Sequence, residues 1–297
     1  MALSGGGGTV AGDALLRAKE RAENFPVALR VLPRRFRQHL VAVYDVVRVI
    51  DDLGDEAAGD RTAQLEAFAE DLARVWAGGE PRAAVLRRLV PTVRATGLPK
   101  ELFDRMVAAN LQDQRVSEYA TFDELRQYCT LSADPVGRMV LCVFGVTSDT
   151  GWDSKAGGRI TAGELSDRVC TALQLVEHWQ DVAEDRRKGR VYLPKEDMAQ
   201  YGVSPSDLDS AAASPALRRL MAFQTERAAA LLDSGAPLVG MMHGWGRLAV
   251  AGYVAGGRAA VDALRRCGGE VLAATPSTRK RDVLRHLPRL LLTRGRL

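Results

Sequence analysis

Two short segments of the sequence each carry aspartates four residues apart, and this spacing is the first indication of chemistry. Asp51 and Asp55 form one pair, and Asp181 and Asp185 form the other. In a helix, residues four apart lie on one face, where two negative charges repel each other. A bound cation offsets that repulsion, and carboxylates without nearby Cys or His suit Mg²⁺, which usually shares its coordination shell with substrate phosphates. The two pairs therefore predict a magnesium site that holds a phosphorylated substrate.

Each aspartate pair continues upstream as a polar stripe on the same predicted helix face. Tyr44 and Arg48 precede the first pair at helical spacing, and Gln174 and Glu177 precede the second. Arg48 could bind a phosphate in bidentate fashion, or it could form an ordinary surface ion pair with Asp52. The second stripe is either the wall of a cavity or an exposed amphipathic face. Together the two stripes favour a shared site for magnesium and diphosphate.

Composition indicates an all-α protein. The chain has 297 residues, 46% of them hydrophobic, and long segments repeat apolar residues at three- and four-residue spacing. Because both aspartate helices are expected to face one central cavity, we predict a single-domain helical bundle over residues 13–297. The glycine-rich residues 1–12 are predicted to be disordered. The predicted helices cover residues 13–23, 33–53, 61–76, 82–95, 99–116, 121–148, 160–186, 205–211, 214–234, 237–244, 246–267 and 277–291.

Several function classes are disfavoured. A dispersed formal charge of +4 does not indicate binding to nucleic acid. The four cysteines lack paired spacing, which is typical of reduced thiols in a cytoplasmic protein, and neither a signal peptide nor a membrane-spanning run is evident. Glycine-rich phosphate loops, serine nucleophile motifs and zinc motifs are also absent from the sequence. The basic and apolar residues 285–296 are either a plain last helix and tail or a site of peripheral contact with an anionic membrane.

Several blocks, in the same order along the chain, resemble the squalene/phytoene synthase family of head-to-head prenyl synthases. The resemblance runs from about Glu23 to Leu208 and rests on residues 24–28, 44–55, 128–137, 174–185 and 190–194. It implies an isoprenoid-synthase bundle in which two or three Mg²⁺ ions bridge the diphosphate of a prenyl substrate. The implied metal ligands are Asp51, Asp52, Asp55, Asp181 and Asp185. The implied catalytic residues are Arg48, Tyr44 and Tyr128, and the implied substrate-binding residues are Phe25, Gln174, Glu177, Arg190, Tyr192 and Tyr253.

Within the family, residues 23–28, 132–138 and 179–182 resemble the hydroxysqualene synthases of bacterial hopanoid gene clusters. This implies ionisation of presqualene diphosphate, supplied by a sister presqualene diphosphate synthase, and capture of the rearranged cation by water without NADPH. The chain departs from the family pattern at Glu177, which replaces an Asn, at Gln180, which replaces an Arg of many relatives, and at Gly257, which replaces a Tyr.

Two alternatives remain open. A condensing enzyme of the same fold would join two farnesyl or geranylgeranyl diphosphates to give presqualene diphosphate, dehydrosqualene or phytoene. It would have to hold two diphosphates, and the loss of a basic residue at Gln180 argues against that. A non-catalytic binding partner is the other alternative, but related non-enzymatic proteins lose aspartates that this chain retains.

Overall fold

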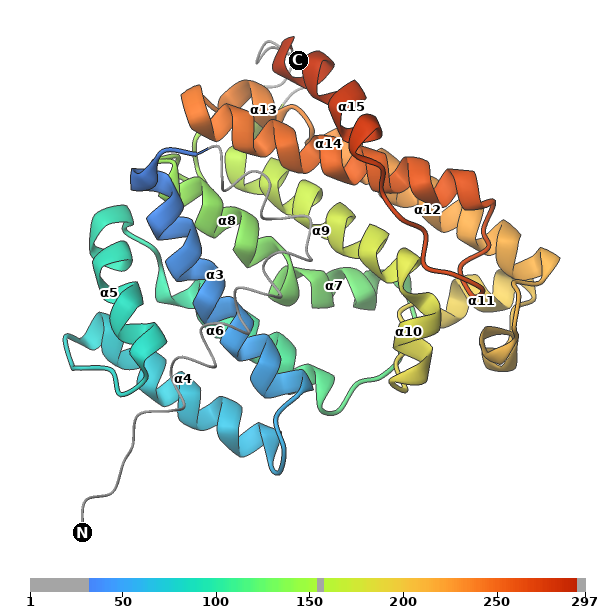
Figure 1. The fold of residues 1–297 in the computed structure, drawn as a ribbon, viewed down its shortest axis with the longest axis horizontal. Helices are drawn as coiled ribbons and strands as arrows, with labels where there is room; N and C mark the ends of the chain where they lie inside the picture. The colour runs from blue at the N-terminus through green and yellow to red at the C-terminus, as the bar shows by residue number, and fades with distance from the viewer. Residues whose placement is uncertain (1–31, 154–157, 293–297) are drawn as a thin grey trace.

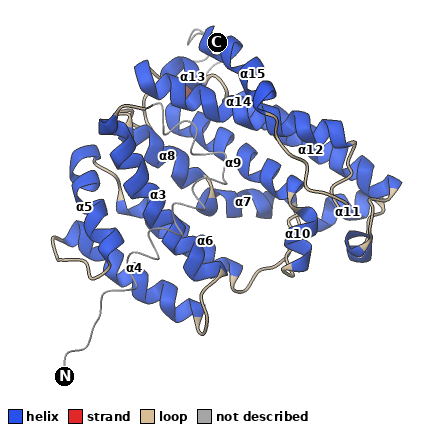
Figure 2. Cartoon of the chain, viewed as in Figure 1, coloured by secondary structure: helices blue, strands red, loops and turns tan. Residues whose placement is uncertain are grey.

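The computed structural model describes residues 32–153 and 158–292, and its architecture is a bundle of α-helices (Figures 1 and 2). Helices α3–α6 form one side of the bundle, α7–α9 its middle, and α12–α15 the opposite side. This confirms the predicted all-α fold. The helices are α3 (Arg34–Asp55), α4 (Arg61–Ala77), α5 (Ala84–Thr96), α6 (Lys100–Asp113), α7 (Phe122–Ser132), α8 (Asp134–Val143), α9 (Ala162–Gln180), α10 (Val182–Arg187), α11 (Lys195–Tyr201), α12 (Pro215–Gly235), α13 (Leu238–Met241), α14 (Gly244–Cys267) and α15 (Lys280–Leu292), with a 3-10 helix at Pro205–Asp209.

Some predictions concern residues beyond this range. The predicted disordered segment 1–12, the predicted helix 13–23, Phe25 and the chain after residue 292 lie outside the described residues. None of the helices within residues 32–153 and 158–292 combines the length and apolar character needed to cross a lipid bilayer. The four cysteines are free thiols, of which Cys129 is buried.

Local capping explains why many helix boundaries were predictable. The side chains of Asp60 and Ser214 accept hydrogen bonds from backbone amides in the first turns of α4 and α12. Such caps satisfy amides that have no partner inside the helix. Thr161 and Glu164 form a reciprocal capping box at the start of α9. At the other end of α4, Gly78 adopts a left-handed conformation, which glycine reaches without steric cost.

Two long predicted helices are interrupted in the structure. The predicted helix over residues 121–148 is two helices, because the chain turns at Ala133 and Pro135 sits in the first turn of α8, a position that needs no amide proton. The predicted helix over residues 160–186 is also divided, at Asp181. Helix α11 and the antiparallel hairpin of β1 (Gly151–Asp153) and β2 (Arg159–Thr161) were not predicted.

Helix α9 lies at the centre of the bundle and contacts α7, α8, α12 and α14. Its apolar side chains include Leu175 and Trp179, which are fully buried. Helix α3 packs on the other side of the bundle against α4, α5 and α6. The chain therefore presents its two aspartate segments on different helices of a common core.

A close approach between α3 and α6 occurs next to the first aspartate segment. A methyl group on Gly54 would lie 2.1 Å from Asn110 Oδ1 and 3.1 Å from Asn110 Cβ. The Asn110 amide donates hydrogen bonds to Asp51 Oδ1, at 3.3 Å, and to the carbonyl of Met106. Any side chain at residue 54 would therefore displace the amide from Asp51.

We expect Gly54→Ala to lower the free energy of unfolding by about 1–3 kcal/mol, because displacement of the buried amide outweighs the gain in helix propensity. Gly256→Ala in α14 is the matched control, since a methyl group there would meet nothing within 4 Å. Denaturant titration should show the control to be neutral or stabilised by up to about 1 kcal/mol. Equal changes in the two variants would contradict the proposed packing constraint.

A buried carboxyl group makes stability depend on pH. Asp134 is 4% exposed and accepts a hydrogen bond from Thr171 Oγ1 at 2.8 Å. Burial, assisted by the nearby charge of Asp167, raises the pKa of Asp134 from 3.8 to about 7. The pKa of Asp134 is higher in the folded chain than in the unfolded chain. The contribution of Asp134 to stability is therefore present at low pH and is lost as pH rises from about 4 through 7.

We expect Asp134→Asn to become progressively more stable than the wild type as pH rises from 4 to 8. The amide resembles the protonated carboxyl group, so the difference should be small near pH 4 and should approach at most about 4 kcal/mol above pH 7. Denaturant midpoints measured across this pH range would test this. If the unfolding free energies of the wild type and the variant differ by the same amount at every pH, Asp134 does not titrate in this range.

Candidate active site

The first aspartate segment lies in the last turns of α3. Asp51 is partly buried, and burial raises its pKa to about 7 even though the hydrogen bond from Asn110 and the charge of Arg48 favour the carboxylate. Arg48 Nε lies 3.1 Å from Asp52 Oδ1, so the ion pair considered from the sequence is present. Tyr44 is partly buried on the same helix. Protonation of Asp51 is thus favoured wherever no cation offsets its burial.

The second aspartate segment lies where α9 gives way to α10. Asp181 ends α9, yet the amide of Asp185 still donates to the Asp181 carbonyl at 2.8 Å. The four-residue spacing of the pair therefore survives the interruption of the helix. Burial, followed by the charges of Asp185 and Glu184, raises the pKa of Asp181. Lys188 lies 2.8 Å from Glu184 and partly offsets the negative charge.

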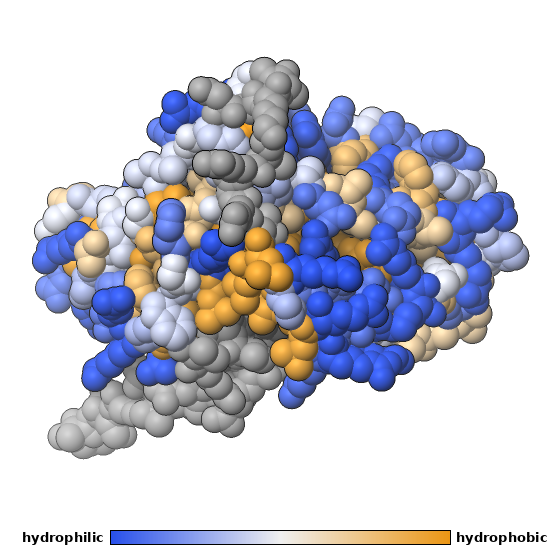
Figure 3. All heavy atoms as spheres, turned by 90° about the horizontal axis from the view of Figure 1, so that it is seen from above, coloured by the Kyte–Doolittle hydropathy of each residue, from blue (hydrophilic) through white to orange (hydrophobic). Residues whose placement is uncertain are grey.

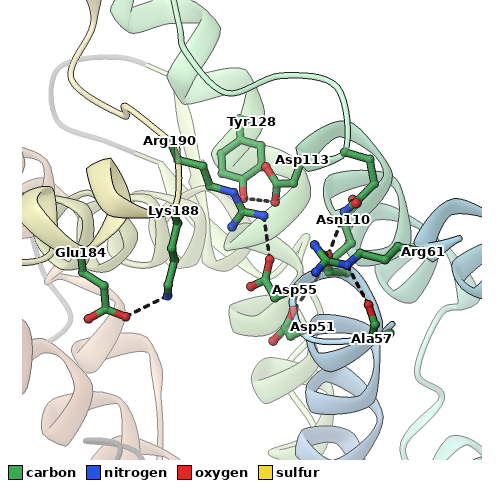
Figure 4. A network of polar contacts seen from close by, with 12 residues as sticks. Asp51, Asp55, Ala57, Arg61, Asn110, Asp113, Tyr128, Glu184, Lys188 and Arg190 are labelled. Carbon is green, nitrogen blue, oxygen red and sulfur yellow. Dashed lines mark hydrogen bonds and ion pairs between the residues drawn. The ribbon is translucent and has the colours of Figure 1, made fainter. Parts of the chain in front are cut away.

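Arg190 joins the two segments. Its Nη2 donates to Asp55 Oδ1 at 2.7 Å, and its backbone amide donates to the Asp185 carbonyl at 2.9 Å. Figure 4 shows Arg190 and Lys188 between the end of α3 and the α10 segment. The loop that carries them is held against the chain after α6 by a hydrogen bond from the Val191 amide to the Ser117 carbonyl. Residues far apart in sequence therefore meet at one mixed acidic and basic site.

Behind Arg190 lies a buried group of aromatic and ionisable side chains. Tyr128, which is 5% exposed, donates from its hydroxyl to Asp113 Oδ2 at 2.8 Å. Burial raises the pKa of Asp113 to about 6, against the opposing effects of Tyr128 and Arg190. The Tyr192 ring stacks on His178 with centroids 3.6 Å apart. Tyr128 and Tyr192 thus pack together beside the acidic site.

Two residues of α6 take part in this arrangement without having been identified from the sequence. Asn110 contacts Asp51, and Asp113 contacts Tyr128. Their three-residue spacing places them on one helix face, which is the signal that could have revealed them. In the sequence alone, this pair resembles the polar face of any amphipathic helix.

An apolar cavity of about 240 Å³ extends along α8 and α9. Gln174 and Glu177 of α9 line it on the side toward Asp181, and Tyr253 of α14 lines it on another side. The residues that form most of its wall are apolar or small: Ala133, Val136, Gly137, Val140, Leu141, Val169, Leu173, Leu238 and Val250. Among the predicted substrate-binding residues, Gln174, Glu177 and Tyr253 are therefore brought together.

Gly137 brings α8 and α9 unusually close at this cavity. A methyl group on Gly137 would lie 2.3 Å from Ser166 Oγ and 2.5 Å from Cys170 Sγ. The side chains of Ser166 and Cys170 also line the cavity. The backbone of α8, rather than a side chain, therefore forms this part of the wall.

Gln174 also contacts the aromatic group behind Arg190. Its Nε2 lies 3.1 Å from His178 Nε2, and His178 Nδ1 lies 3.7 Å from Asp185 Oδ2. His178 is buried. His178 therefore connects Gln174 of the cavity wall to Asp185 of the second aspartate segment through direct contacts. Within the described residues it does not belong to a cluster of side chains that could hold a metal ion.

The acidic residues are suited to a metal ion that arrives with an anionic ligand. Within residues 32–153 and 158–292, no three His, Cys, Asp or Glu side chains converge closely enough to hold a metal on their own. Each segment instead supplies carboxylate oxygens from a pair of aspartates. Mg²⁺ prefers oxygen and is commonly held by one or two carboxylates plus substrate phosphates. The donor set therefore fits diphosphate-bridged magnesium.

Comparison with known proteins shows what kind of chain this is. It matches the squalene/phytoene synthase family over residues 18–289. A hydroxysqualene synthase of Rhodopseudomonas palustris is 35% identical over 221 residues, which cover 73% of this chain and 70% of the relative. A 15-cis-phytoene synthase of Synechococcus elongatus is 34% identical over 212 residues, covering 70% and 68%. The crystal structure of squalene synthase HpnC from Alicyclobacillus acidocaldarius superposes with a TM-score of 0.75 at 39% identity, covering 87% of this chain and 94% of that one.

The match extends over most of the chain and includes both aspartate segments, the cavity helices and α14. Family members are isoprenoid synthases that use diphosphate substrates and generally depend on a metal ion. The chain therefore belongs to the squalene/phytoene synthase family.

Proposed function

We propose that the protein ionises presqualene diphosphate and captures the rearranged cation with water to give hydroxysqualene. The observation that carries this proposal is the position of the cavity: its apolar wall runs along α9 as far as Glu177, one helical turn before Asp181. A diphosphate head and a hydrocarbon tail need this combination of polar and apolar surroundings. Relatives with similar sequence identity to this chain are named hydroxysqualene synthase and phytoene synthase. Overall identity therefore does not distinguish these reactions, and the choice between them must rest on individual side chains.

In this proposal, Asp51, Asp55, Asp181 and Asp185 hold two or three Mg²⁺ ions, and Asp52 contributes less because it pairs with Arg48. When bound, the metal supplies positive charge that stabilises the leaving diphosphate. Arg190 exchanges its partner Asp55 for a diphosphate oxygen. Such charge-assisted contacts are among the stronger hydrogen bonds in proteins.

Part of the organic portion of the substrate occupies the cavity, whose volume is about 240 Å³. Burial of each CH₂ group stabilises the complex by about 0.8 kcal/mol, and Tyr253 presents an aromatic ring to the cavity. Gln174 and Glu177 border the head group, whereas Phe25, Tyr44 and Tyr192 complete the proposed binding and catalytic residues. When water forms its new C–O bond, the proton passes to the Tyr128–Asp113 pair or to the released diphosphate.

Gln180 favours this reaction over condensation of two prenyl diphosphates. Its amide donates to the Pro276 carbonyl and thereby anchors the chain segment before α15. A neutral amide held in this way supplies no positive charge to a second diphosphate. Condensation therefore remains the alternative that direct product analysis must exclude.

We expect purified protein with Mg²⁺ and presqualene diphosphate, in ¹⁸O-labelled water and without NADPH, to release diphosphate and form hydroxysqualene. The hydroxyl group should carry the label because water captures the cation. Mass spectrometry of the extracted products is the measurement. Consumption of farnesyl or geranylgeranyl diphosphate as sole substrate, with formation of a condensed product, would instead establish the alternative reaction.

We expect Asp51→Asn and Asp181→Asn each to lower kcat by about a hundredfold or more, because each removes a proposed metal ligand. Asp45→Asn is the control on α3, where Asp45 lies near Arg88, and Asp209→Asn is the control opposite Arg186 of α10. Both controls should retain nearly normal turnover. If folded Asp51→Asn and Asp181→Asn proteins are as active as the wild type, the shared metal site is wrong.

A further inference from the structure

Helix α15 has an inner face that is tightly anchored. Arg266 Nη1 lies 2.7 Å from Asp282 Oδ2, and His286 Nε2 lies 2.8 Å from Asp262 Oδ2. Leu290 is 2% exposed. Val283, Leu287 and Leu291 pack on the same apolar cluster. The orientation of α15 on α14 is therefore fixed by both polar and apolar contacts.

The outer face of α15 combines apolar and basic side chains. Leu284 is 66% exposed and Leu292 is 79% exposed. They recur at helical spacing with exposed cations, so they share one stripe. We call this surface the outer stripe, and it consists of Arg281, Leu284, Arg285, Pro288, Arg289 and Leu292. An ordinary solvent-exposed helix face does not alternate leucine with arginine in this way.

A third exposed apolar residue lies near the C-terminal end of α15. Trp245, at the start of α14, is 38% exposed. Arg247 Nη2 donates to the Leu291 carbonyl at 2.8 Å, which places this end of α14 beside the end of α15. Within the described residues, the exposed large hydrophobic side chains are Trp245, Leu284 and Leu292. All of them therefore belong to α14 and α15.

The charge of this surface is strongly positive. Lys280 and the three arginines of the outer stripe are exposed, whereas Asp282, the acidic residue of α15, is buried against Arg266. Figure 3 views this side of the molecule and shows hydrophobic surface bordered by hydrophilic side chains. Apolar residues that enter the acyl boundary and cations that meet lipid phosphates are the two requirements of an interfacial helix.

We propose that the outer stripe, together with Trp245, binds the surface of an anionic lipid bilayer, with α15 lying parallel to it. The long arginine side chains can extend to the head groups while the leucines enter the acyl region. Tryptophan is favoured at this depth because its ring is amphipathic. An acidic protein partner would satisfy the cations, but it would not require leucines exposed along the same stripe.

The lipid-binding surface lies one helix away from the cavity. Val250 and Tyr253 of α14 line the cavity, while α15 packs along the same helix. Binding at the outer stripe therefore brings the cavity wall close to the bilayer. If the proposed function is correct, this position shortens the aqueous path of a very apolar product, although lipid binding itself does not depend on that reaction.

The test is co-flotation of the full-length protein with phosphatidylcholine vesicles that contain or lack phosphatidylglycerol. We expect binding to the anionic vesicles, weaker binding at high salt because screening reduces surface attraction, and little binding to the neutral vesicles. Leu284→Ser with Leu292→Ser should weaken binding at least about tenfold. Arg281→Gln with Arg285→Gln should weaken it about fivefold for each arginine removed.

Arg94→Gln with Arg126→Gln is the matched control, because it removes two exposed arginines from α5 and α7. It should bind vesicles as the wild type does, and thermal unfolding should show that all variants remain folded. Failure of the wild type to float with anionic vesicles would overturn the proposal. The proposal would also be overturned if the control lost as much vesicle binding as the Arg281→Gln and Arg285→Gln variant, or if the leucine variant lost none.

Discussion

Burial of carboxylates that also repel their neighbours is the constraint on which the acidic end of this structure depends. The two aspartate segments lie at the end of α3 and at the junction of α9 and α10, and burial, together with neighbouring carboxylates, raises the pKa of Asp51 and Asp181. The chain offsets this crowding locally with the Asn110 amide and across the site with the Arg190–Asp55 ion pair. The loop after α10 and the close packing at Gly54 can both be understood as supports for these contacts.

The sequence predicted most helices because their ends carry local signals. Asp60 and Ser214 cap helices that begin as expected. The interruption at Asp181 was missed because apolar periodicity continues through it and tertiary packing decides where the chain turns. Asn110 and Asp113 were missed for a similar reason: their partners Asp51 and Tyr128 lie on other helices.

Helix α9 explains how one fold can serve several reactions of this family. Its buried residues build the core, its cavity-lining residues include Gln174 and Glu177, and its end carries Asp181. The acidic end and the apolar wall can remain unchanged while a few neighbouring positions vary. At Gly257, for example, a methyl group would lie 2.5 Å from Leu173 Cδ2, so a large side chain there requires different packing of α9 and α14.

The approach of α8 to α9 at Gly137 couples the width of the cavity to the packing of the two helices. Because main chain forms this wall, the cavity cannot be widened there by trimming a side chain, and a side chain added there would have to displace Ser166 Oγ and Cys170 Sγ. A wider cavity would therefore have to come from other parts of its wall, where larger residues such as Leu173 and Leu238 can be shortened. The glycine at position 137 therefore fixes one side of the cavity, and substitution there is constrained by the packing of α8 on α9.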